Sequence, residues 1–187
     1  MNEKDYAPLT AICVKNLSDK LYEKRKTGAM EVERIVKELV SSGKKSHIKK
    51  VLKILGDEFA LSSNPNARNG GFIGLAASSI ALGKEANNYV EDLIRPVVPS
   101  CTDQDSRVRF YACEALYNIC KVCRGFVLPF FNEIFDGVSK VCLCMKYMYI
   151  LSLICFARMN FSEQYHTEGK VWVRGCMEKS ISSKIYQ

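Results

Sequence analysis

The fold of this chain is decided at residues 105–124, which read DSRVRFYACEALYNICKVCR. The stretch opens with an aspartate, a residue type that commonly caps the start of a helix. Apolar residues then follow at the spacing of a helix that buries one face: Val108, Tyr111, Ala112, Ala115, Leu116 and Ile119. The stretch therefore predicts a long helix packed against a core.

Two earlier stretches, residues 21–39 and 65–82, have the same character. Each of the three stretches carries a basic residue in its first turn, namely Arg25, Arg68 and Arg107, separated by 43 and 39 residues. A period of about 40–47 residues with two helices per unit is typical of HEAT and armadillo arrays. We therefore predict an all-α, superhelical repeat array of about three and a half helix pairs over residues 1–140.

The basic and acidic residues around the third stretch suggest contacts between units. In such arrays an aspartate and an arginine at these positions commonly form a hydrogen-bonded ladder. We expect Asp105, Arg107 and Arg109 to contribute to this ladder together with Arg68, with direct ligand binding as the alternative role of the arginines. The second helices of the pairs should line the partner-binding face of the array. Glu114 and Asn118 are candidates for that surface by position alone.

Composition indicates one globular domain with a basic surface. The chain has 187 residues, 48% of them hydrophobic and 25% charged, and a net charge of +7. Its densest basic run is KKSHIKK at residues 44–50. Such a run can contact acidic lipid headgroups or nucleic acid, or it can be a solvated helix start. Because no aromatic residues are interleaved, we expect no nucleic-acid partner.

Residue types that carry out chemistry are sparse. Cys120 and Cys123 form a CxxC, but it lies near the predicted end of a helix and has no second pair at zinc-site spacing. The two histidines, His47 and His166, lie in a basic helix start and an irregular tail. We therefore expect no catalytic residues, no cofactor and no metal. The polar start, MNEKD, has no apolar signal core, which favours a cytoplasmic location.

The repeat pattern stops near Val141. Residues 141–187 contain four of the nine cysteines and the single tryptophan, Trp172, and they begin with an apolar run over 141–157. We interpret this segment as a non-homologous, hydrophobic and cysteine-rich tail, such as a translated intron or an alternative last exon. The chain would then be a truncated form of a longer array.

Several strings in order resemble the start of the vacuole-morphology scaffold family, also called ArPIKfyve. They are EKDYAPL at 3–9, DKLYEKRK at 19–26, EFALS at 58–62, the stretches 70–83 and 105–118, LPFFN at 128–132 and FDG at 135–137. The resemblance covers residues 1 to about 140 and ends where the repeat pattern ends.

The resemblance implies a non-enzymatic HEAT-repeat scaffold. In this family the scaffold holds the PIKfyve lipid kinase together with a Sac-domain phosphoinositide phosphatase on endosomal or vacuolar membranes. The assembly controls phosphatidylinositol 3,5-bisphosphate. The N-terminal repeats are associated with the kinase, so we expect kinase binding to be kept and phosphatase binding to be lost here. Membrane association would be peripheral, through the complex. The repeat pattern alone also allows a generic helical-repeat transport adaptor.

Overall fold

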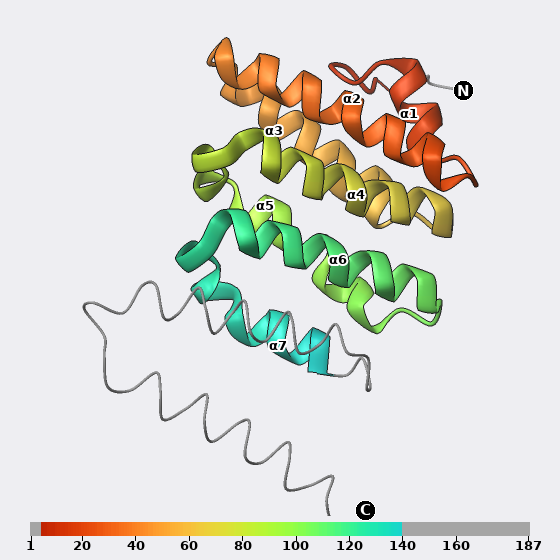
Figure 1. The fold of residues 1–187 in the computed structure, drawn as a ribbon, viewed down its shortest axis with the longest axis vertical. Coiled ribbons are helices and arrows are strands. Elements are labelled where there is room, and N and C mark those ends of the chain that lie inside the picture. The colour runs from red at the N-terminus through yellow and green to blue at the C-terminus, as the bar shows by residue number, and fades with distance from the viewer. Residues whose placement is uncertain (1–4, 140–187) are drawn as a thin grey trace, which may run out of the picture.

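The computed structural model describes residues 5–139, and every regular element in that range is a helix (Figure 1). The α-helices are α1 (Ala11–Leu17), α2 (Tyr22–Ser41), α3 (Lys45–Lys53), α4 (Pro65–Leu82), α5 (Val90–Ile94), α6 (Ser106–Cys123) and α7 (Phe131–Ser139). Short π or 3-10 segments join them: η1 (Ile54–Ala60), η2 (Gly83–Asn88), η3 (Val98–Thr102) and η4 (Arg124–Phe130). The predicted all-α repeat array is confirmed.

The helices form two layers. The long helices α2, α4 and α6 lie side by side in the layer nearest the viewer of Figure 1, and α3 and α5 lie behind them. The middle helix, α4, packs against both α2 and α6. Each unit therefore places its second helix in one layer and its first helix in the other, as the period of the sequence predicts.

Local sequence signals define where the long helices begin and end. The Asn64 side chain accepts a hydrogen bond from the Asn66 amide at 2.9 Å, and Pro65 occupies the first position of α4. Asp105 caps α6 by accepting from the Arg107 amide at 2.8 Å. At the other end of α2, Gly43 adopts a φ of +65°, a conformation that favours glycine.

The first helices of the pairs are less regular than the second ones. The sequence predicts one helix over residues 88–100 that Pro96 and Pro99 interrupt or end. In the structure only α5 is α-helical there, and η3 begins after a short gap. Proline lacks the amide donor that an α-helix needs in its interior, so the helix stops before Pro96.

Small residues allow α4 to occupy the centre of the array. A Cβ atom added to Gly70 would overlap the main-chain oxygen of Leu17, at the end of α1. A Cβ atom added to Gly71 would lie 2.6 Å from the amide nitrogen of Ala60. Phe72, by contrast, needs a large side chain, because it is fully buried in the core. The α4 helix therefore contacts the backbone of its neighbours through Gly70 and Gly71 and fills the core through Phe72.

Within residues 5–139 no helix combines the length and the hydropathy that crossing a bilayer would require. The tail that the sequence analysis assigns to residues 141–187 lies outside the described residues.

We predict that Gly70→Ala destabilises the fold by about 1–3 kcal/mol, because the added methyl group forces α1 and α4 apart. Thermal or urea denaturation of the purified chain measures this change. Ile80→Ala, at an exposed site on the same helix, is the control and should change stability by less than about 0.5 kcal/mol. Equal stability of Gly70→Ala and the wild type would contradict the packing described.

Candidate functional site

An arginine near the start of each second helix holds the turn that precedes it. Its Nη1 atom donates two hydrogen bonds, to the main-chain carbonyls six and five residues upstream. We call this arrangement the arginine clamp, and it occurs three times within residues 5–139. Arg25 donates to Asp19 (2.9 Å) and Lys20 (2.8 Å), and Arg68 donates to Ser62 (2.9 Å) and Ser63 (3.1 Å). Arg109 donates to Asp103 (2.8 Å) and Gln104 (2.9 Å).

The turn held by each clamp is also the same in all three units. Its first side chain accepts a hydrogen bond from the amide two residues later: Asp19 from Leu21 (2.9 Å), Ser62 from Asn64 (3.2 Å) and Asp103 from Asp105 (2.9 Å). Short polar side chains form such turns readily. The repeated turn and the repeated clamp together define which residues are equivalent between units.

This equivalence differs from the one that the spacing of basic residues suggested. The residue equivalent to Arg25 and Arg68 is Arg109, whereas the Arg107 side chain is exposed. The spacings between clamp arginines are therefore 43 and 41 residues. Asp105 is the helix cap of α6, and the acidic partner across units is Asp103.

Two clamp arginines also reach into later units. Arg68 Nη2 lies 3.3 Å from a carboxylate oxygen of Asp103, and both side chains are mostly shielded from solvent. Arg25, only 5% exposed, donates from Nη2 to the Tyr111 hydroxyl at 3.3 Å. Its guanidinium carbon lies 5.5 Å from the centre of the Tyr111 ring. Charge-assisted contacts therefore join the first unit to the third and the second to the third.

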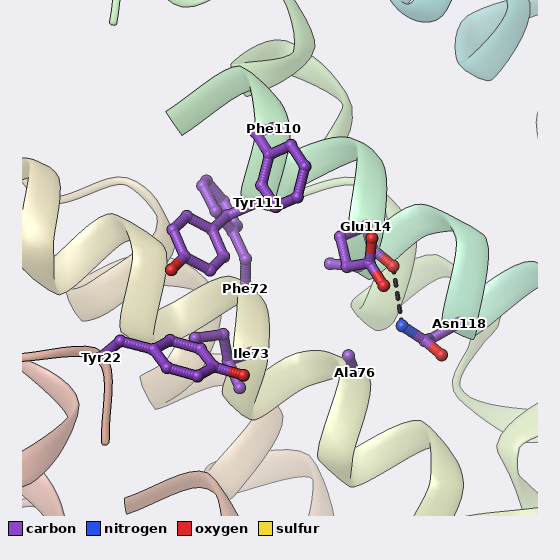
Figure 2. Close-up of a pocket in the computed structure, with 9 residues that line it drawn as sticks. Tyr22, Phe72, Ile73, Ala76, Phe110, Tyr111, Glu114 and Asn118 are labelled. Carbon is purple, nitrogen blue, oxygen red and sulfur yellow. Dashed lines mark hydrogen bonds between the residues drawn. The ribbon is translucent and has the colours of Figure 1, made fainter. Parts of the chain in front are cut away.

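A hollow of about 410 Å³ opens on the layer of the second helices. Figure 2 shows residues from three helices around it. Its walls are Tyr22 from α2, then Phe72, Ile73 and Ala76 from α4, and Phe110, Tyr111, Glu114, Ala115 and Asn118 from α6. The structure thus brings the two candidate surface residues, Glu114 and Asn118, to the wall of one hollow.

Aromatic rings give the hollow its shape. Tyr22 and Tyr111 stack with their ring centres 6.3 Å apart, and Phe110 meets Tyr111 edge to face at 5.6 Å. Further along α6, the Asn118 amide donates to the main-chain carbonyl of Glu114 at 2.9 Å (Figure 2). The result is an apolar hollow with a polar wall on α6.

Exposed apolar side chains continue beyond the hollow on the same layer. Tyr22 and Phe110 are about half exposed although both are large and apolar, and so are Met30 on α2 and Ile80 on α4. The positions equivalent to Ile80 in the neighbouring units are the exposed Lys37 on α2 and Lys121 on α6. An apolar centre with a charged rim is the usual anatomy of a protein-binding surface.

The sequence analysis did not single out Tyr22, Ile73 or Phe110 as surface residues. A signal was present at Phe110, because at about 100° per residue it falls on the side of the helix opposite the apolar face that contains Val108 and Ala112. Finding the hollow also required the neighbouring helices, because its walls come from units more than 80 residues apart in the chain.

Burial keeps the thiols of Cys13, Cys120 and Cys123 in their protonated, unreactive form. Burial raises the pKa of Cys13 to about 11 and the pKa values of Cys120 and Cys123 to about 12, with the neighbouring Cys123 also raising the pKa of Cys120. These thiols are protonated at neutral pH, and only the thiolate is a good nucleophile or ligand. Among residues 5–139, no group of three or more histidine, cysteine or acidic side chains is arranged to hold a metal ion.

Comparison with known proteins identifies the region that contains the hollow. Residues 66–147 match the family model described as the Vacuolar 14 Fab1-binding region. The matched part of the chain belongs to the VAC14 family. The Protein VAC14 homolog of Arabidopsis thaliana is 58% identical over 127 residues. The Vacuole morphology and inheritance protein 14 of Saccharomyces cerevisiae is 47% identical over 129 residues. The resemblance inferred from the sequence is confirmed.

The VAC14-type match covers 68% of this chain in both comparisons, but 17% of the Arabidopsis protein and 15% of the yeast protein. The chain therefore spans less than a fifth of the length of these relatives. No solved structure matches the chain. The family region begins in the first turn of α4 and includes α6, so it contains eight of the nine residues around the hollow.

The clamp register makes a direct prediction about two arginines only two positions apart. Arg109→Ala should destabilise the chain by about 1.5–3 kcal/mol, since it removes two hydrogen bonds from a charged donor to main-chain carbonyls. Arg107→Ala is the matched control and should cost less than about 0.5 kcal/mol. Chemical denaturation of both variants distinguishes the two registers, and a larger loss at Arg107 would contradict the one described.

Proposed function

We propose that the VAC14-type region of this chain is a non-catalytic scaffold segment that binds a Fab1-type lipid kinase, the PIKfyve kinase. The contact would be made by the layer of α2, α4 and α6. The observation that carries the proposal is the position of the hollow, because its walls on α4 and α6 lie inside the matched Fab1-binding region. The exposed aromatic residues at this hollow are the kind that anchor protein interfaces.

The chemistry of the hollow suits an apolar anchor from the kinase. Phe110 and Tyr22 offer exposed ring surface, and Ile73 and Ala76 form an apolar floor between them. The carboxylate of Glu114 gives the wall on α6 an acidic group, which favours a basic or hydrogen-bond-donating neighbour beside the anchor. Residues of this composition bind by burying rings and excluding water, without any catalytic group.

The wider role follows from the family. We infer that the segment belongs to an assembly on endosomal or vacuolar membranes that regulates phosphatidylinositol 3,5-bisphosphate, and that it acts there as a peripheral component. A Sac-domain phosphatase would bind parts of the longer relatives that this chain does not span.

The proposal predicts that Phe110→Ala weakens binding of the kinase at least about tenfold, because truncating an interface aromatic commonly costs 2 kcal/mol or more. The chain is co-expressed with the kinase, and the complex is measured by affinity capture and then by titration. Phe126→Ala is the matched control, since Phe126 is 56% exposed, compared with 46% for Phe110, and does not line the hollow.

If the wild type binds the kinase and Phe110→Ala binds it with the same affinity, the kinase contact lies elsewhere than at the hollow. Capture of no kinase by the wild-type chain would contradict the proposed function itself. Thermal denaturation of both phenylalanine variants checks that any loss of binding does not come from unfolding.

A further inference from the structure

The charges at the start of α3 are unfavourable for the helix, whereas Lys50 and Lys53 lie in its last turn, where a cation is favourable. Lys44 stands at its N-cap without a side-chain capping bond, Lys45 is its first residue, and the first turn contains no acidic residue. The N-terminal end of a helix carries a partial positive charge, so cations there are unfavourable. Lys45, Lys49 and Lys53 then follow four residues apart, a spacing at which like charges on a helix repel each other.

These three lysines form one exposed line, which we call the α3 lysine ridge. All three side chains are exposed, whereas Ile48, Val51 and Leu52 on the opposite side of α3 are buried. Lys45, Lys49 and Lys53 make no ion pair with any residue in the range 5–139, although the exposed Asp57 follows four residues after Lys53. Nearby, Lys50 pairs with Asp5 at 2.7 Å at an exposed position.

Several basic residues on other helices form ion pairs with acidic residues of the same helix. On α2, Arg34 pairs with Glu31 at 2.7 Å, and Lys37 pairs with Glu33 at 2.6 Å. On α5, Arg95 pairs with Glu91 at 3.1 Å. Pairs of this spacing are how a solvated helix face normally balances its charge. Lys26 on α2 and Lys121 on α6 also make no ion pair within residues 5–139, but they stand singly. The ridge differs in aligning three unpaired, exposed lysines along one face of a helix, which concentrates positive charge there.

We propose that the α3 lysine ridge binds the anionic surface of a lipid bilayer. Lysine ammonium groups on flexible stems suit mobile, diffusely negative headgroups, whereas fixed phosphate recognition favours the planar, bidentate arginine. The run from Lys44 to Lys53 contains no arginine, phenylalanine, tyrosine or tryptophan, and His47 is its one ring on which a base could stack. The ridge is therefore a line of single positive charges, which suits a bilayer surface whose anionic headgroups have no fixed arrangement.

The position of α3 makes this contact compatible with a protein partner. In Figure 1, α3 lies in the layer behind α2 and α4, whereas the hollow opens on the layer of α2, α4 and α6. A chain resting on a bilayer through α3 would leave the hollow accessible. The inference does not depend on the kinase, since it concerns a different surface and a ligand that can be tested with the chain alone.

The test is co-sedimentation of the full chain with vesicles of phosphatidylcholine, with and without phosphatidylserine. The wild type should bind the anionic vesicles, and less so as salt is raised. Replacing Lys45, Lys49 and Lys53 by glutamine should weaken this binding at least about tenfold, since each lysine near an anionic surface contributes roughly fivefold. The matched control replaces Lys26, Lys37 and Lys121 by glutamine, which removes the same charge from the other layer and should leave binding nearly unchanged.

Equal binding by the ridge variant and the wild type would overturn the proposal, and so would equal losses in both triple variants, which would reflect net charge alone. Equal binding to vesicles without phosphatidylserine would also overturn it. Displacement of the chain from vesicles by double-stranded RNA at equal phosphate concentration would overturn the proposal and indicate that the ridge binds nucleic acid. The melting temperature of the ridge variant should match or exceed that of the wild type, because Lys45 opposes the helix dipole and the three lysines repel one another. A clearly lower melting temperature would assign the lysines to stabilising the fold and would overturn the proposal.

Discussion

The arginine clamp is the interaction on which the arrangement of the helices depends. Each clamp donates hydrogen bonds to two main-chain carbonyls that lie in a turn and so lack a partner within a helix. It thereby fixes that turn against the first turn of the next helix. Because the same contact recurs at Arg25, Arg68 and Arg109, successive second helices start from the same geometry and lie side by side. Arg25 and Arg68 then reach later units, so the clamp also sets the contacts between repeats.

The two functional surfaces follow from that arrangement. Glycines in α4 bring the layers close together, and a hollow remains where the rings of α2 and α6 project beside Ile73 and Ala76 of α4. The first helices form the other layer, where α3 presents its lysines. Alternation of the two helix types thus separates an apolar, ring-lined surface from a basic one, which lets a scaffold engage a protein and a membrane on different layers.

The sequence predicts the architecture better than the details of either surface. Helical periodicity and the spacing of the three similar stretches were enough to predict the helix pairs, because the apolar pattern of each helix is written in its own residues. The register of the ladder was harder, since Arg107 and Arg109 are both plausible and only the turn at Asp103 distinguishes them. The hollow depends on which rings remain uncovered after three units pack, and no local pattern around Phe110 specifies that.

Hydrogen–deuterium exchange of the chain, free and bound to the kinase in the absence of lipid, tests the central claim that the layer of second helices is the binding surface. The account predicts slower exchange in peptides from α4 and α6 that cover residues 72–76 and 110–118, with α3 unchanged. Protection confined to α3 and α5, or no protection of α4 and α6 at saturating kinase, would contradict it.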